Sequence, residues 1–139
     1  TTKTKKTVKK VIMYLLIIVN DHDQVYLEKI ESGTLWENLY SGPFFYKKLN
    51  MESWLTEKNI FDAKMKYKFE TTHRVTNKNI RIINHVYFLK NDKKVSFSSE
   101  NWYNLSKINV GIPRYFDKAL KVYRSINEKN YVQKIEKRG

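Results

Sequence analysis

The sequence predicts an α+β fold, an α-β-α sandwich in which a β-sheet is flanked by two helices. Three observations support this fold class: a nine-residue apolar run at 11–19, an alternating apolar and charged segment at 64–70, and apolar residues at helical spacing after Pro113. The chain has 139 residues, of which 41% are hydrophobic and 14% aromatic, so it is long and apolar enough for one domain with its own core.

The amino-terminal half predicts a hairpin followed by a helix. Residues 11–19 are apolar without alternation, which indicates a strand buried on both faces. A turn at 20–23 leads into a second strand at 24–30, a pairing that is typical of a hairpin. Asn50 is a suitable N-cap for a helix over about 51–58, because its side chain can accept a hydrogen bond from the first turn. One face of this helix carries Met51, Trp54 and Leu55.

The carboxyl-terminal half predicts further strands and the second helix. The alternation at 64–70 indicates a half-buried strand with a basic outer face. Residues 71–79 are expected to form a polar loop before a long antiparallel strand at 80–89, and a turn and a weak strand are expected within 91–98. Pro113 suits the first turn of a helix, on which the apolar residues recur at helical spacing: Phe116, Ala119, Leu120, Tyr123 and Ile126.

The charge of the chain favours polyanionic partners. Lysine and arginine number 27 against 14 acids, a net charge of +13, and the bases gather at the amino terminus, at 64–81 and at 114–129. Such a balance suits DNA, RNA or an anionic membrane surface. A membrane surface is disfavoured because no basic helix carries a continuous apolar face. A composition rich in Lys, Asn and Ile produces the same charge without binding nucleic acid, so charge alone leaves the choice open.

Several other chemistries are excluded or disfavoured. The chain has no cysteine, which excludes disulfides and thiolate-bound metals, and no apolar run approaches the roughly 20 residues that span a bilayer. With no signal-peptide pattern either, we expect a soluble cytoplasmic protein without a membrane partner. His22, His73 and His85 are scattered along the chain, which argues against a metal site.

The acids of the first helix bear on one enzymatic alternative. A two-helix sandwich around a mixed sheet is also the architecture of Nudix pyrophosphohydrolases, in which several helix carboxylates converge on Mg²⁺. Here the helix offers Glu52 and Glu57, which five residues of helix place about 140° apart. A degenerate Nudix-type nucleotide hydrolase therefore stays an alternative, as does a basic protein-interaction domain such as one that docks a replication clamp.

Several segments, in order along the chain, match the pattern of one known family. Residues 35–43 read Leu-Trp-Glu-Asn-Leu-Tyr-Ser-Gly-Pro, where the family has Leu-Trp-x-Gly-Leu-Trp-x-Phe-Pro, with Asn38 for Gly and Gly42 for Phe. The helix containing Trp54 follows, and then residues 73–77, His-Arg-Val-Thr-Asn, where the family has His-x-Phe-Ser-His. Residues 102–105 and the helix after Pro113 close the series. From about Lys9 to about Tyr123, the chain resembles the carboxyl-terminal, Nudix-like domain of the MutY adenine DNA glycosylases, which act opposite 8-oxoguanine.

The resemblance implies a mixed, Nudix-like sheet and a lesion-recognition loop. By position, Val75 takes the place of Phe, Thr76 of Ser and Asn77 of His in that loop, which begins at His73. Five bases are expected to hold the DNA backbone: Arg74, Lys78, Lys64, Lys66 and Lys68. Without the resemblance, residues 74–79 are typical of an ordinary polar hairpin loop. Three aromatic residues are stacking platforms for bases or, as we favour, packing residues: Trp36, Tyr40 and Trp54.

The resemblance also implies a domain organisation and partners. Residues 1–10 are expected to be a basic connector from a catalytic domain absent from this chain, 11–129 the recognition domain, and 130–139 a charged tail that frays. The domain is expected to have no catalytic residue, metal or cofactor of its own. In the family the absent domain is an adenine N-glycosyl hydrolase that often carries an iron–sulfur cluster. The expected partners are duplex DNA containing 8-oxoguanine opposite adenine and the catalytic domain of the same polypeptide, and we expect a monomer associated with a bacterial nucleoid.

Overall fold

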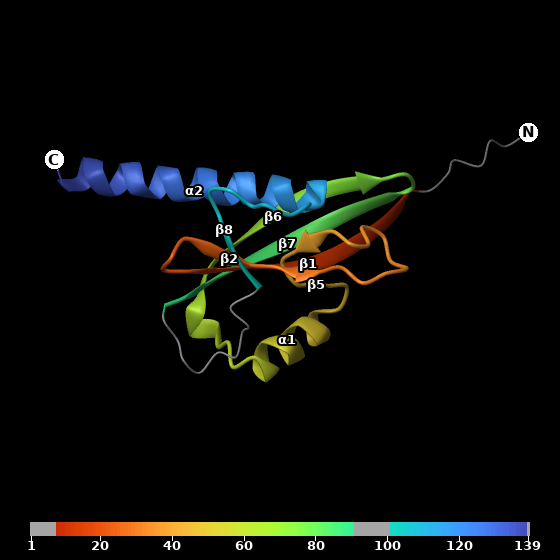
Figure 1. Ribbon diagram of the computed structural model, residues 1–139. Helices are drawn as coiled ribbons and strands as arrows, with labels where there is room; N and C mark the ends of the chain where they lie inside the picture. The colour runs from red at the N-terminus through yellow and green to blue at the C-terminus, as the bar shows by residue number, and fades with distance from the viewer. Residues whose placement is uncertain (1–7, 91–100, 139) are drawn as a thin grey trace, which may run out of the picture.

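The computed structural model describes residues 8–90 and 101–138, except for the side chains of residue 63 and of those after 130. A six-stranded mixed sheet forms the centre of the molecule (Figure 1). Its strands run in the order β6-β7-β1-β2-β8, with β5 paired to β1 beside β2. Their bounds are Lys9–Asn20 (β1), Gln24–Tyr26 (β2), Phe44–Phe45 (β5), Met65–Val75 (β6), Lys78–Leu89 (β7) and Trp102–Asn104 (β8).

The helices lie on opposite faces of this sheet, as the α-β-α sandwich requires (Figure 1). Helix α1 spans Lys48–Glu57 and helix α2 spans Arg114–Arg138. A short 3₁₀ helix at Asp62–Lys64 leads into β6, and a separate two-stranded sheet pairs β3 (Glu28–Lys29) with β4 (Tyr40–Ser41). The predicted fold class, a mixed sheet flanked by two helices, is therefore confirmed.

Strand β1 is the central strand of the sheet. It pairs in parallel with β7 along its full 12 residues, and in antiparallel fashion with β2 and β5. Successive side chains of a strand point to opposite faces. Accordingly Leu15 and Ile17 are buried in the cluster beneath α2, whereas Leu16 and Ile18 are buried in the cluster beneath α1. The prediction of a strand buried on both faces is confirmed from Leu15 to Val19, whereas Ile12, nearer the start of the strand, is exposed.

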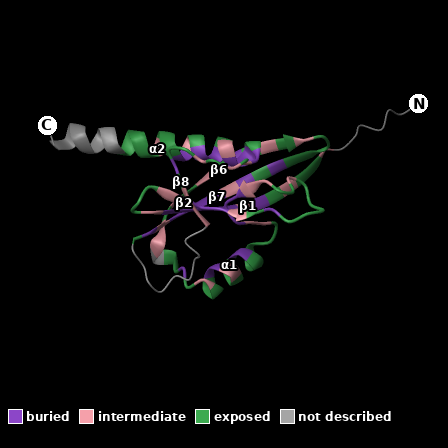
Figure 2. Ribbon diagram, viewed as in Figure 1, coloured by how far each residue is buried: buried purple, intermediate pink, exposed green. Residues whose placement is uncertain are grey.

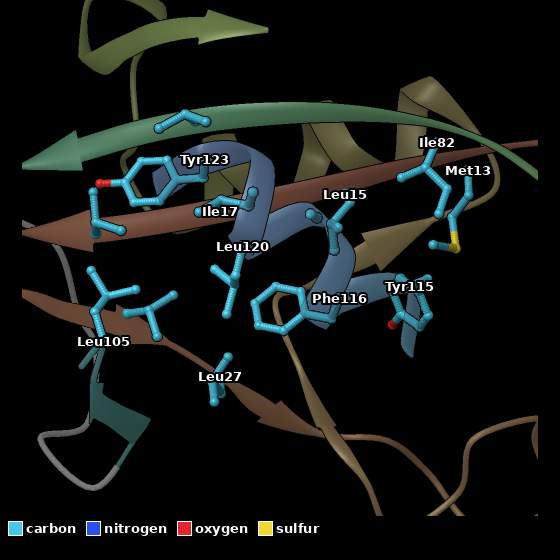
Figure 3. Packing of buried hydrophobic residues seen from close by; sticks show 14 of the residues in the cluster. Met13, Leu15, Ile17, Leu27, Ile82, Leu105, Tyr115, Phe116, Leu120 and Tyr123 are labelled. Atoms are coloured by element: carbon cyan, nitrogen blue, oxygen red, sulfur yellow. The ribbon is translucent and has the colours of Figure 1, made fainter. Parts of the chain in front are cut away.

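The larger cluster lies between the sheet and α2. Helix α2 contributes Tyr115, Phe116 and Leu120, all at most 1% exposed, to the same cluster as the residues of β1. Figure 3 shows these side chains close to those of β1. The helical spacing seen in the sequence thus marks the buried stripe of α2. The helix continues to Arg138, through the segment for which a frayed tail is expected.

The smaller cluster lies beneath α1, where the structure corrects one prediction. Met51 and Leu55 are buried against the sheet, as their spacing predicts. The helix begins at Lys48, however, and Lys47 occupies the N-cap position with no side-chain hydrogen bond. The backbone amide of Asn50 already donates to the Lys47 carbonyl at 3.1 Å, so the first turn closes before Asn50 can cap it.

The predicted strand at 24–30 is interrupted at Leu27. The backbone amide of Leu27 donates to the Asn101 carbonyl at 2.9 Å, while β3 beyond it pairs with β4 in the small sheet. The turn and weak strand expected within 91–98 lie outside the described residues. No helix among the described residues is both long enough and apolar enough to cross a membrane.

The polar loop predicted at 71–79 is wrong. Strand β6 continues to Val75, β7 begins at Lys78, and only Thr76 and Asn77 lie between them. Two of the inward positions, Thr71 and His73, are polar but still packed: Thr71 is 6% exposed, and its hydroxyl accepts a hydrogen bond from the buried Asn84 amide at 3.0 Å. Because polar residues occupy inward as well as outward positions, the sequence did not reveal the alternation of inward and outward side chains that β6 retains.

Candidate nucleic-acid interface

The predicted recognition loop is the tip of a long hairpin. Strands β6 and β7 pair in antiparallel register from Met65↔Tyr87 to Val75↔Lys78, which leaves Thr76 and Asn77 as the turn. Both turn residues are exposed. Figure 1 shows this end of the hairpin reaching past both helices. The turn is therefore open to a large partner.

The tip of the hairpin is also held to the first strand. The backbone amide of Lys9 donates to the carbonyl of Asn77 at 3.0 Å, and Lys9 and Lys10 stand in register with Lys78 and Asn79 of β7. Basic residues from the start of β1 thus lie beside the turn, although 67 sequence positions separate Lys10 from Asn77. This juxtaposition depends on the parallel pairing of β1 with β7.

The four predicted recognition residues divide into two pairs. Thr76 and Asn77 project from the tip, whereas Val75 is half-buried against the cluster beneath α2. His73 is half-buried as well, and its ring centroid lies 6.1 Å from those of both Trp36 and Tyr115. The turn residues are placed for contact, and the two preceding residues secure the hairpin to the core.

The environment of His73 lowers its pKa. Burial is the larger cause, and the positive charges of Lys118 and Arg114 lower the pKa further. These effects favour the neutral imidazole over the imidazolium ion. His73 is therefore suited to support the hairpin rather than to bind a phosphate.

The structure separates the five bases predicted to hold the DNA backbone. Arg74 and Lys78 flank the turn and are exposed. Lys66 stands at the other end of β6, nine residues from Val75, which corresponds to about 30 Å of strand. Its ammonium lies 5.5 Å from the ring centroid of Phe88. Lys64 precedes β6, and Lys68 lies between Lys66 and the turn.

Other polar residues, which the sequence grouping did not assign to the site, accompany Arg74. Across three strands, Arg74, Asn79 and Lys10 form one row, and Thr72, Arg81 and Ile12 form the next. All six are exposed, and they line a hollow of about 510 Å³. The register between strands that are distant in the sequence creates these rows. The one sign of them in the sequence is that the polar residues Asn79 and Arg81 alternate with Ile80 and Ile82, which are buried.

The acid Glu70 neighbours these rows. The guanidinium of Arg81 donates from Nε to Glu70 Oε2 at 2.9 Å and from Nη2 to Glu70 Oε1. These hydrogen bonds lower the pKa of Glu70 and raise that of Arg81. Because both side chains are exposed, the pair orients Arg81 while contributing little stability.

The aromatic residues considered as stacking platforms pack within the protein. The Trp36 ring lies 4.7 Å from Tyr115 and Tyr40 lies 5.9 Å from Tyr103, while Trp54 lies 6.1 Å from Phe45, all between ring centroids. Trp36, Tyr40 and Trp54 are half-buried by these contacts. The packing interpretation accounts for their position.

Two departures from the family pattern have structural explanations. Asn38 has φ 68°, a left-handed conformation that Gly adopts freely and Asn tolerates better than most residues. At Gly42, an added Cβ would lie 2.1 Å from the Leu16 carbonyl oxygen, so the chain passes too close to β1 for any side chain. Asn38 therefore suits a left-handed backbone position, and Gly42 allows the chain to pass close to Leu16 of β1.

The described residues offer no group of three or more His, Asp or Glu side chains that could hold a metal ion. Glu52 and Glu57, the two acids of α1, are both exposed.

Comparison with known proteins places these features in context. No protein-family model matches the chain. An adenine DNA glycosylase of Buchnera aphidicola subsp. Baizongia pistaciae (strain Bp) is 25% identical over 130 residues, which cover 90% of this chain. Over most of its length the chain is thus similar to part of an adenine DNA glycosylase, in line with the resemblance found in the sequence. It spans about a third of the length of that relative, 36%.

Solved structures agree with this relationship at the level of the fold. The MutT protein of Methanosarcina mazei Go1 superposes with a TM-score of 0.59 at 14% identity, covering 86% of this chain and 96% of that one. An Ap4A hydrolase of C. elegans has a TM-score of 0.47 at 15% identity, covering 69% and 81%, and is too distant to add to the argument. The sandwich is thus Nudix-like in fold.

Proposed function

We propose that this chain is a non-catalytic DNA-binding domain of an A/G-specific adenine DNA glycosylase, acting in base excision repair on cytoplasmic DNA. The observation that carries the proposal is the exposed turn Thr76-Asn77, flanked by Arg74 and Lys78 at the uncovered end of the sheet. Similarity to a glycosylase over 90% of the chain supports DNA as the partner. Base flipping and cleavage of the glycosidic bond belong to the remaining length of such an enzyme.

The proposed ligand is 8-oxoguanine paired with adenine, and the turn has suitable chemistry. Guanine N7 is a hydrogen-bond acceptor, whereas 8-oxoguanine carries a hydrogen at that position. The hydroxyl of Thr76 can accept that hydrogen, and the side-chain amide of Asn77 can donate to a phosphate or a base edge. A hydroxyl can also donate to N7 of normal guanine, so Thr76 contributes only part of the discrimination.

The surroundings of the turn support this role. His73 and Val75 pack against the core beneath α2, and Asn77 is bonded through its carbonyl to β1, so the turn is attached on two sides. A recognition residue is effective when its supporting residues are themselves fixed by packing. Val75, by contrast, is aliphatic and packs toward the core, so it provides no aromatic wedge between bases.

The proposed contacts to the DNA backbone differ with the distance of each base from the turn. Arg74 and Lys78 reach phosphates next to the lesion, and Lys68, Lys66 and Lys64 serve only a duplex that follows β6 away from the turn. Each phosphate contact adds salt-dependent affinity without sequence information. A nucleotide hydrolase is less well supported, because α1 carries two exposed acids, Glu52 and Glu57, on different sides of the helix.

The proposal is tested by titrating the 139-residue chain with two duplexes at several salt concentrations. One duplex carries 8-oxoguanine opposite adenine, and the other carries guanine at the same place. We expect a preference for the lesion that persists as salt rises, because neutral hydrogen bonds are little affected by counterions. Equal binding to both duplexes would contradict lesion recognition by this domain.

A double variant tests the turn itself. Thr76→Ala with Asn77→Ala should lower the lesion preference by about fivefold or more, the equivalent of one lost hydrogen bond of about 1 kcal/mol. The matched control, Ser53→Ala with Asn109→Ala, changes two exposed residues away from the turn. If both double variants keep the preference of the unmodified chain, the recognition residues lie elsewhere.

A further inference from the structure

One face of the sheet is uncovered beside the recognition turn. On the side of α1, Leu16 and His85 are buried beneath the helix, but Ile12 and Arg81, four residues nearer the turn on the same two strands, are exposed. Figure 2 shows exposed residues alternating with buried ones along this end of the hairpin. The sheet therefore presents a solvent-facing surface next to Thr76.

We name this surface the hairpin-end face and define it by the two rows across β6, β7 and β1: Arg74, Asn79, Lys10, Thr72, Arg81 and Ile12. Residues paired across neighbouring strands point to the same side of a sheet. Neighbouring strands lie about 4.8 Å apart, and successive same-face residues about 6.6 Å apart. Lys10, Arg74 and Arg81 thus form a compact triangle of cations.

The electrostatics of this face are one-sided. Lys68 extends the three cations along β6, and Glu70 is the acid that β6, β7 and β1 contribute to this side of the sheet. Burial lowers the pKa of His85, and the positive charges of Lys68 and Lys48 lower it further, so the positive field extends toward α1. An exposed sheet surface with clustered cations and short polar side chains such as Thr72 and Asn79 has the chemistry that binds a line of phosphates.

We propose that the hairpin-end face binds one phosphodiester backbone of the duplex, extending the contact made by the turn. In this arrangement Lys10 and Arg81 hold phosphates beside those held by Arg74. The proposal rests on DNA being the partner of this domain. Two observations support it: the charge complementarity of the face and its direct continuity with the turn, through the Lys9–Asn77 hydrogen bond.

Glu70 has a defined role in the same arrangement. It accepts two hydrogen bonds from the guanidinium of Arg81 and so holds that group over the face. Glu70 also occupies N–H donors on two nitrogens of the Arg81 guanidinium, Nε and Nη2, and offsets its positive charge. Glu70 therefore orients Arg81 and at the same time limits the affinity of the face for phosphate.

The experiment measures binding of the 139-residue chain to an undamaged duplex between about 50 and 200 mM salt, the range over which phosphate contacts are most evident. Lys10→Gln and Arg81→Gln should each weaken binding severalfold and reduce the slope of log affinity against log salt by about one. Glu70→Gln should strengthen binding, because it removes the competing charge. Lys129→Gln, at an exposed position on α2, is the matched control and should change neither quantity as much.

The outcomes separate this proposal from the proposed function. If Lys10→Gln and Arg81→Gln keep the salt slope of the unmodified chain, or change it no more than Lys129→Gln does, the face does not bind phosphate. The same holds if no binding is detected at low salt, or if duplex RNA of equal length is preferred to DNA. Lesion preference measured on the turn variants is independent of this slope, so lesion recognition by the turn can fail while phosphate binding by the face stands, and the reverse.

Discussion

The two ends of β7 show how one strand serves a core and an interface. From Asn84 to Tyr87 every residue is buried, because α1 covers one face and α2 the other. From Asn79 to Ile82 the burial alternates, with Ile80 and Ile82 buried and Asn79 and Arg81 exposed. The covered end requires apolar residues on both faces, whereas the uncovered end leaves one face available for a partner. The position of α1 therefore decides where binding residues can stand.

The largest expected effect concerns the covered end. Phe116→Ala should destabilise the fold by about 3–5 kcal/mol, because the ring is fully buried between α2 and the sheet. Urea unfolding followed by circular dichroism would measure the loss. Ile12→Ala is the comparison at the uncovered end, where the side chain is 43% exposed, and should cost clearly less. Equal losses would show that the two ends do not differ as described.

Gly42→Ala should cost about 1–3 kcal/mol, the usual range for overpacking. The added methyl group would lie 2.1 Å from the Leu16 carbonyl oxygen, which belongs to the central strand and cannot move freely. The same unfolding measurement applies. Gly33→Ala would be a poor control, because the φ of Gly33, 84°, adds backbone strain that Gly42 does not involve. Gly111→Ala is the better control, since its nearest neighbour is the flexible Leu39 side chain at 3.1 Å. Two similar losses would contradict the close approach at Gly42.

Asn38→Ala should cost about 1–2 kcal/mol, the penalty of a left-handed conformation for an ordinary residue. Asn38→Gly should stay close to the unmodified chain, because Gly adopts this conformation without steric cost. Asn109→Ala, at an exposed loop position, is the matched control for removing an amide. Thermal unfolding of the variants would check the order. A Gly variant as unstable as the Ala variant would indicate that the amide, and not the backbone, is what matters at this position.

The smallest expected effect is a dependence of stability on pH. Burial lowers the pKa of both His73 and His85 in the folded chain, so the unfolded chain binds protons first as pH falls. The free energy of unfolding should therefore decrease below about pH 6.5, the ordinary value for histidine, until the folded pKa values are reached. His73→Gln with His85→Gln should flatten that slope. A slope unchanged in the double variant would assign it to other groups.

Particular residues show how far the sequence could be interpreted. The doubly buried part of β1, Leu15 to Val19, and the buried stripe of α2 were predictable, because in both cases the pattern of apolar residues identifies the buried faces. The hairpin was partly missed, since Thr71 and Thr72 are polar whether they face inward or outward. The turn residues Thr76 and Asn77 emerged from the family resemblance, and their exposure agrees with that assignment without testing it.

Local pattern and composition were enough to predict the two helices, the fold class and the excess of positive charge. Which charges meet depends instead on the tertiary structure. Lys10 joins Arg74 and Arg81 through the pairing of β1 with β7, while Lys66, closer to both in sequence, lies at the far end of the strand. Register between strands distant in the chain arises from how the whole sheet packs between its helices, and no local pattern of residues contains it.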